Sequence, residues 1–140
     1  MADMSTIIAD VQQRLQQHVR ETLTQLTGDI IDLTPVKTGY LQSSWYFSDT
    51  AAPRAYRGNP RAGNDKTSTK NRVAQQIQQG LQPSVPAMVA VYNNTEYAPI
   101  IEAGRVGPGV GSLQAPNGMM RVNLLRFPLI SDRVAQALNR

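Results

Sequence analysis

The sequence predicts a single α+β domain in which a long N-terminal helix and a C-terminal helix pack on a small, mainly antiparallel sheet. Three observations predict this fold: apolar residues at helical spacing in the first third, two short strand-like segments, and a second helical pattern near the C-terminus. The 140 residues suit one domain, 1–140, and no internal repeat divides them. Two long loops, at about 50–68 and 104–116, lack apolar periodicity, and we expect both to be flexible.

The predicted N-terminal helix carries one apolar stripe. Its members recur at spacings of three or four, which places them on one side of a helix: Ile8, Val11, Leu15, Val19, Leu23, Leu26, Ile30 and Leu33. Asp3 or Ser5 can cap its start. Gly28 interrupts the pattern at a cost of about 1 kcal/mol relative to alanine, and it indicates a bend or a close contact. Pro35 ends the helix because it restricts the backbone of Thr34.

Two segments are expected to form strands. Tyr40–Ser48 alternates in the manner of a strand, with Leu41, Trp45 and Phe47 on one face. Trp45 is the only tryptophan, and we expect it to anchor the core. Ala87–Tyr92 is apolar on both faces, which is typical of a central strand that is covered on both sides.

Shorter helices are expected between and after these strands. Thr69–Leu81 has apolar residues at four-residue spacing, and Pro99–Ala103 is expected to form a helical turn. Gly118–Arg140 is helical in pattern, with Pro128 in its interior. Proline there either kinks the helix or starts a new one at its first turn.

The residues that most enzymes and metal sites require are scarce. The chain has no cysteine, which excludes disulfides and thiolate chemistry, and its one histidine, His18, cannot form a site that needs two. Asp29 and Asp32 are too few for an oxygen-ligated ion, and no serine occupies a recognisable nucleophile elbow. We therefore expect no enzymatic activity, no cofactor and no metal site.

Two conspicuous features are interpreted as structural. The glycine-rich run Gly104–Ser112 lacks the ending of a P-loop, and we interpret it as a flexible loop. Glu102 has only Glu96 near it in sequence, whereas a catalytic carboxylate normally has a second acid or base beside it. We expect Glu102 to pair with an arginine or to cap backbone N–H groups.

Nothing in the sequence predicts export or a membrane span. The first residues contain only a short apolar pair, Ile7–Ile8, which is too short for the core of a secretory signal. No stretch approaches the ~20 apolar residues of a transmembrane helix. We expect a soluble protein that is made in the cytoplasm and has no membrane partner.

Positive charge is concentrated in one segment of the chain, which has a net charge of +4 at pH 7. Between Thr50 and Gln75 a single acid, Asp65, is accompanied by Arg54, Arg57, Arg61, Lys66, Lys70 and Arg72. Arg105 adds a candidate in the second loop. Arginine near an aromatic such as Tyr56 can bind a nucleic-acid backbone and stack on a base. The alternatives are a contact with an acidic protein and a solvated loop without a partner.

Three motifs stand in order along the chain: Thr34–Trp45 (TPVKTGYLQSSW), Tyr92–Gly104 (YNNTEYAPIIEAG) and Gln114–Arg121 (QAPNGMMR). We expect Gly39 to permit a tight turn, and Gly104 to release the chain into the second loop. The residues that we single out as structural determinants are Thr34, Pro35, Thr38, Gly39, Leu41, Trp45, Tyr97, Pro99, Glu102, Gly104, Pro116 and Gly118.

In this order the motifs resemble those of the neck or tail-completion proteins of long-tailed bacteriophages, over roughly Ile30 to Arg121. The sequence departs from that pattern at Lys37, where the family often has an acidic residue. The resemblance implies a structural virion protein of the neck, made in the host bacterial cytoplasm. It implies one copy in a ring, with six-fold symmetry favoured, that completes the tail end and helps to join tail to head.

The same resemblance implies the partners. They are further copies in the ring, neighbouring tail-terminator, tail-tube or head-closure proteins, and packaged DNA through non-specific contact. We expect Arg54–Lys70 and Arg105–Leu113 to become ordered on assembly. The main alternative is a basic nucleic-acid-binding module that uses Arg54–Arg72, and a small hydrolase is the weakest hypothesis.

Overall fold

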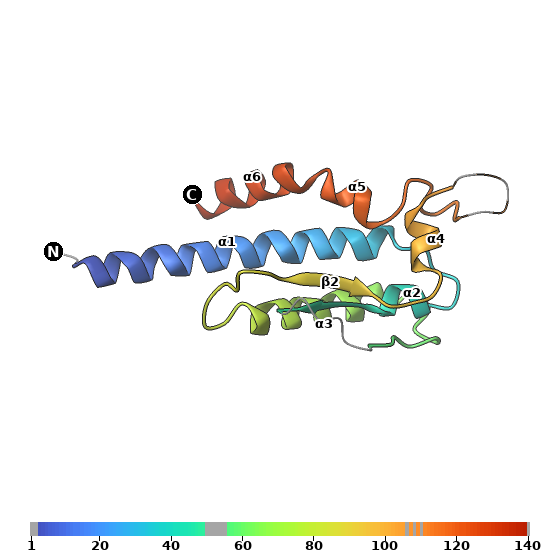
Figure 1. Cartoon of the computed structure of the whole chain (residues 1–140), viewed down its shortest axis with the longest axis horizontal. Coiled ribbons are helices and arrows are strands. Elements are labelled where there is room, and N and C mark those ends of the chain that lie inside the picture. The colour runs from blue at the N-terminus through green and yellow to red at the C-terminus, as the bar shows by residue number, and fades with distance from the viewer. Residues whose placement is uncertain (1–2, 50–55, 106, 108, 110, 140) are drawn as a thin grey trace.

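The long helix α1 (Met4–Leu33) is the spine of the molecule. The structure, a computed structural model, describes residues 3–49, 56–105, 107, 109 and 111–139. Helix α6 (Phe127–Leu138) runs antiparallel along one side of α1, and α3 (Lys66–Gly80) lies on the other side with a strand pair (Figure 1). The remaining elements are β1 (Trp45–Ser48), β2 (Ala90–Asn93), α2 (Tyr40–Ser43), α4 (Ala98–Glu102) and α5 (Met120–Leu124). The predicted α+β fold, with a long first helix, a C-terminal helix and a small antiparallel sheet, is confirmed.

Both ends of α1 form as predicted. Of the two candidate caps, Asp3 is the residue whose carboxylate accepts a hydrogen bond from the Thr6 backbone N–H, at 2.9 Å. Thr34 leaves the helical conformation immediately before Pro35. The helix continues through Gly28, where an added Cβ atom would lie 3.7 Å from Cδ of Lys70. That distance is an ordinary van der Waals contact, so no close approach requires glycine at this position.

The prediction of a strand over Tyr40–Ser48 is wrong for its first half. Gly39 has a φ of 91°, and the chain then makes one helical turn, α2, in which the Ser43 N–H donates to the Gly39 carbonyl at 3.1 Å. The strand begins only at Trp45, and its four residues are all buried. The expected alternation of buried and exposed side chains fails because Tyr46, on the second face, is covered by two other aromatic rings. The ring centres of Tyr56 and Tyr92 lie 5.3 and 5.0 Å from the ring centre of Tyr46.

The second strand is shorter than expected and is not central. β2 begins at Ala90 and, among the described residues, pairs only with β1, in antiparallel register, with Phe47 opposite Val91 and Trp45 opposite Asn93. Its residues are half-buried, so its apolar composition reflects contacts on both faces of a two-stranded ribbon. A sequence that is apolar on both faces is compatible with a central strand and with one strand of a two-stranded ribbon, so the pattern alone does not distinguish them.

Helix α3 begins three residues earlier than predicted, because Asp65 caps it. The Asp65 carboxylate accepts hydrogen bonds from the Ser68 backbone N–H at 3.1 Å and from the Ser68 hydroxyl at 2.7 Å. Side chains of α3 also cover the outer edge of β1, where the Gln76 amide oxygen accepts the Phe47 N–H at 2.9 Å. An edge that is occupied in this way cannot recruit another strand.

The C-terminal helical pattern is divided between two helices. Pro128 lies in the first turn of α6, so it starts a new helix. Ile130 and Val134 of α6 are buried, whereas Leu124 and Phe127 remain 50% and 40% exposed. His18 is half-buried and links α1 to α6, because its Nε2 atom lies 3.1 Å from the Ser131 carbonyl oxygen.

The core lies around the second half of α1. Leu26 and Ile30 of the predicted stripe are buried, but Ile8, Val11 and Leu15 are about half exposed. The other core members come from every part of the fold: Ile31, Leu41, Trp45, Phe47, Val73, Ile77, Leu81, Ala98, Ala115, Met119, Ile130 and Val134. The N-terminal half of the stripe therefore contributes little to folding.

Gly39 supplies a test of the turn that precedes α2. An added Cβ atom would collide with the backbone N of Gly63 in addition to straining the positive φ. We expect Gly39→Ala to lower the free energy of unfolding by roughly 3 kcal/mol. Gly63→Ala is the matched control, because its φ is +59° but no atom lies within 4 Å of the added carbon; it should cost about 1–2 kcal/mol. Urea unfolding followed by Trp45 fluorescence measures both, and equal losses would contradict the collision.

Candidate functional site

The three sequence motifs meet at one end of the molecule, opposite the end that carries both termini (Figure 1). Asn93 Nδ2 donates to the Leu41 carbonyl at 2.8 Å, which joins the second motif to the first. The amide of Gln114 joins the third motif to the first, because its oxygen accepts the Val36 N–H at 3.0 Å and its nitrogen donates to the Val36 carbonyl at 3.4 Å. We call this region the motif end.

The first motif is anchored by a buried hydrogen bond. Trp45 Nε1 donates to the Thr34 hydroxyl at 2.9 Å, and that hydroxyl donates to the Ile30 carbonyl at 2.7 Å. Thr34 and Trp45 are 1% and 4% exposed. The expected role of Trp45 as a core anchor is confirmed, and Thr34 fixes the orientation of its indole.

Glu102 caps backbone donors, which is one of the two structural roles expected of it. Its carboxylate accepts the N–H groups of Met119, Met120 and Arg121 at 2.9, 2.8 and 2.7 Å. These are the unpaired donors at the start of α5, and a carboxylate there is favourable. Gly118 is required beside it, since an added Cβ atom would lie 2.5 Å from the Glu102 carbonyl oxygen.

The second loop is closed at its base. Gly104 has a φ of 84°, and an added Cβ atom would lie 2.6 Å from the Pro116 carbonyl oxygen. The Arg105 N–H donates to that same carbonyl at 2.8 Å. Gly104 and Pro116 thus hold the two ends of the loop together, while residues 106, 108 and 110 lie outside the described part of the chain.

A mainly apolar groove of about 790 Å³ lies at the motif end. It is lined by backbone and side chains of the first motif and by Pro60, Tyr97, Ile101, Ser112 and Gln114. Burial, together with neighbouring Tyr40, raises the pKa of the Tyr97 hydroxyl above its usual range. Lys37 is the one Lys, Arg, Asp, Glu or His among the lining residues that the structure describes, so the groove offers no carboxylate or imidazole for acid–base chemistry.

Two of the predicted interface lysines instead hold α3 against α1. Lys66 Nζ donates to the Asp32 carbonyl at 2.7 Å, and Lys70 Nζ lies 2.8 Å from the Asp32 carboxylate. Burial lowers the pKa of Lys66, although the charge of Asp32 opposes that effect. Lys66 lies in the first turn of α3, which was not predicted to be helical, whereas Lys70 lies within the predicted helix.

Arg72 also faces inward. Its guanidinium donates to the carbonyls of Ser43 and Trp45 at 2.9 and 2.8 Å and lies 4.5 Å from the centre of the Tyr56 ring. Burial lowers the pKa of Arg72, with an opposing contribution from Tyr56. The Tyr56 ring, which was expected to stand among Arg54, Arg57 and Arg61, is thus in contact with Arg72, and this arginine–aromatic contact is internal to the fold.

The remaining basic candidates are accessible. Arg57, Arg61 and Arg105 are exposed, and Arg54 lies outside the described residues, as does the rest of 50–55. The part of the first loop that is described is tied to the motif end: the Asn59 N–H donates to the Ser43 hydroxyl at 2.8 Å, and the Gly63 N–H donates to the Thr38 carbonyl at 2.9 Å.

Sequence reasoning missed the side-chain amides that brace this end. Gln114 contacts a residue 78 positions away, and Gln42 accepts a buried hydrogen bond from Thr69 at 2.7 Å. Neither glutamine has a distinctive spacing. Their partners are set by the tertiary fold, so no local signal could have found them.

No helix in the described ranges is long and apolar enough to cross a bilayer, and no three acidic or histidine side chains among those same residues gather into a metal-binding group. Comparisons with protein-family models, curated proteins and solved structures find no match.

Glu102 supplies a test of how this end is held. We expect Glu102→Gln to lower the free energy of unfolding by about 1–3 kcal/mol, because the uncharged amide cannot match three charge-assisted hydrogen bonds. Glu96→Gln is the matched control, since Glu96 is exposed in the same motif, and it should stay within about 0.5 kcal/mol of the parent. Chemical denaturation measures both variants, and indistinguishable losses would refute the capping role.

Proposed function

We propose that this chain is a structural protein of the bacteriophage neck, present as one copy in a ring that completes the tail end and helps to join tail to head. The observation that carries the proposal is the convergence of the three motifs on one end of the fold. Those motifs carry the resemblance to neck and tail-completion proteins, and their contacts to one another, through Asn93, Glu102 and Gln114, build a braced surface.

The chemistry of the motif end supports a structural role. Glu102 is engaged with three backbone N–H groups, and the groove beside it lacks a general base among its described lining residues. Ser131 Oγ lies 3.3 Å from His18 Nε2, but that nitrogen also lies 3.1 Å from the Ser131 carbonyl, as expected for a tie between two helices. We therefore propose that the protein is not an enzyme.

A ring fits this arrangement because its subunits need two different contact surfaces. In a head-to-tail ring, one patch of each subunit fits a different patch of the next. The proposed partners are further copies of this chain, with six-fold symmetry favoured, and the adjoining tail-terminator, tail-tube or head-closure proteins. In this proposal the protein is made in the host cytoplasm and resides in the virion.

A contact with DNA is limited to the cations that remain accessible. Lys66, Lys70 and Arg72 serve the fold, which leaves exposed Arg57 and Arg61 in the described part of the basic segment. This reduced set favours an auxiliary contact with packaged DNA over a dedicated nucleic-acid-binding module.

The decisive experiment is the mass of the purified protein alone and with isolated tails, by light scattering and electron microscopy. We expect the protein to form a ring at the free end of the tail. Tails already joined to heads are the control, because their ends are occupied and should bind no additional protein.

A different outcome would replace the proposal. If the protein ignored tails but bound duplex DNA at physiological salt, the nucleic-acid module would be the better hypothesis. In that case each phosphate contact should steepen the slope of log affinity against log salt concentration by about 0.9. Arg57→Ala and Arg61→Ala should each reduce the steepness of that slope by about 0.9.

A further inference from the structure

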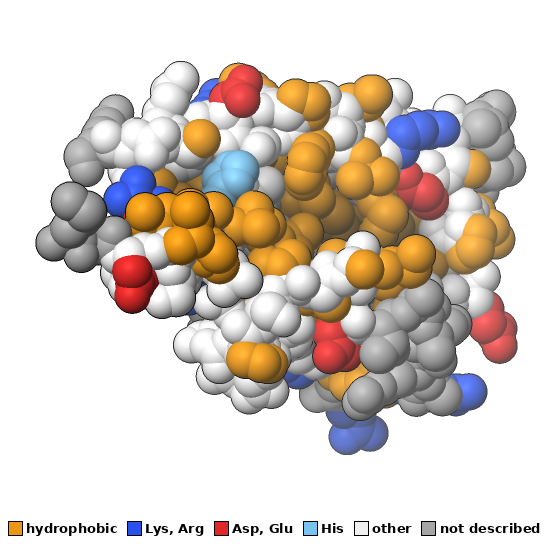
Figure 2. Space-filling model, turned by 60° about the vertical axis from the view of Figure 1, so that its left-hand side comes forward, with side chains coloured by type: hydrophobic (Ala, Val, Ile, Leu, Met, Phe, Trp, Pro, Cys, Tyr) orange, Lys and Arg blue, Asp and Glu red, His pale blue; other side chains and the backbone are white. Residues whose placement is uncertain are grey.

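The first half of α1 carries an apolar ridge that the described chain leaves uncovered. Met4, Ile7, Ile8, Val11 and Leu15 are 69, 48, 49, 58 and 52% exposed. Figure 2 shows hydrophobic side chains gathered at this end, beside the one histidine. Large contiguous apolar patches are rare on the surface of soluble monomeric proteins, and where they occur they usually mark an interaction site.

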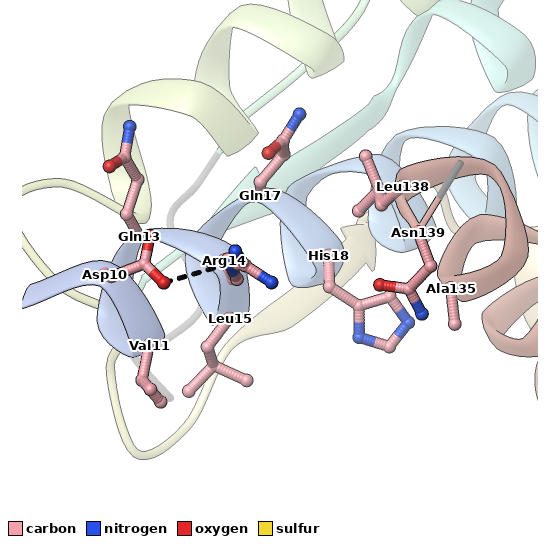
Figure 3. A pocket seen from close by; sticks show the side chains of 10 residues that line it. All are labelled: Asp10, Val11, Gln13, Arg14, Leu15, Gln17, His18, Ala135, Leu138 and Asn139. Carbon is pink, nitrogen blue, oxygen red and sulfur yellow. Dashed lines mark ion pairs between the residues drawn. The ribbon is translucent and has the colours of Figure 1, made fainter. Parts of the chain in front are cut away.

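The ridge is uncovered because α6 stops before reaching it. Helix α6 ends at Leu138, level with His18 of α1, and the two residues line the same hollow. Figure 3 shows Val11 and Leu15 projecting from the same side of α1, beyond the point where His18 lies near Asn139. The stripe that α6 covers further along α1 thus continues into solvent for about three helical turns.

The groove at the motif end has a matching character and lies at the opposite end of the long axis (Figure 1). Tyr97, Ile101, Leu41 and Pro60 give it apolar walls, and its volume of about 790 Å³ accommodates the side chains of one helical turn. One chain therefore presents an apolar ridge at one end and an apolar groove at the other.

The charges around the two surfaces are complementary. Asp3 and Asp10 lie along the ridge together with one basic residue, Arg14, which pairs with Asp10 at 3.1 Å, so two acids against one base leave this segment with a net charge of −1. The groove is lined by Lys37, and exposed Arg61 follows its wall residue Pro60. Opposite charges around two apolar surfaces fix orientation and suppress wrong pairings.

We propose that the α1 ridge of one copy docks in the motif-end groove of a second copy. The inference deepens the proposed function and rests on it, in that it identifies the two surfaces through which a ring would form. Head-to-tail docking covers both apolar surfaces, and because the two surfaces differ, it continues from copy to copy into a ring or a filament. Pairing of two ridges would leave the groove exposed and would stop at a dimer.

Cross-linking tests the pairing directly, because the chain has no cysteine of its own. Val11→Cys protein is mixed with affinity-tagged Tyr97→Cys protein and treated with a short bismaleimide, in solution and on isolated tails. We expect a mixed Val11–Tyr97 product in several-fold excess over that from Thr6→Cys, which has an exposed cysteine on the opposite side of the same helix. Equal yields from positions 6 and 11, or a dominant Val11–Val11 product, would overturn the inference.

Charge substitutions provide a second readout that does not depend on the linker. Val11→Asp alters an exposed position, and Tyr97→Asp places a favoured capping residue at the N-cap of α4, so both variants should fold, as circular dichroism can verify. Each variant alone should remain monomeric. A mixture should form a heterodimer and stop there, because only one intact ridge and one intact groove remain; larger assemblies from either variant alone would contradict the docking.

The same variants separate the two proposals. If Val11→Asp and Tyr97→Asp form rings on tails as the parent does, the docking is wrong and the neck function stands. If the parent assembles through these surfaces but does not bind tails, the docking stands and the neck function is wrong.

Discussion

The hydrogen bond from Trp45 Nε1 to the Thr34 hydroxyl is the contact on which the rest of the fold depends. It joins the end of α1 to the start of β1 across the reversal made by Pro35 and Gly39. Both groups are almost fully buried, so leaving either one unpaired would incur its full desolvation cost. With this contact in place, β1 lies where α3 can cover its edge and where β2 can pair with it.

Much of the architecture was predictable because its signals are local. The apolar stripe and the Pro35 stop defined α1, the two alternatives for Pro128 included the observed one, and Glu102 was expected to cap backbone donors. The main error concerns the segment after Gly39. Gly39 was correctly predicted to turn the chain, but a helical turn follows it before the strand begins. The alternating pattern of Tyr40–Ser44 is typical of a strand and therefore led to the wrong prediction.

The site was less predictable than the fold, because its residues are assigned by tertiary partners. Composition placed the basic residues in one segment but could not say which way they face. Asp65 starts α3 at Lys66, and Lys66 and Lys70 of this helix both contact Asp32. Gln114 and Asn93 belong to the motifs, but nothing in the sequence indicated that their amides connect the motifs to one another.

The position of Gln114 in the chain has a consequence for synthesis. A ribosome makes the first motif early, but the groove gains Ser112 and Gln114, and Glu102 finds its N–H partners at 119–121, only when most of the chain has been released. Helix α6, which covers part of α1, is made after both. A chain that stopped before Gln114 would therefore lack a finished groove.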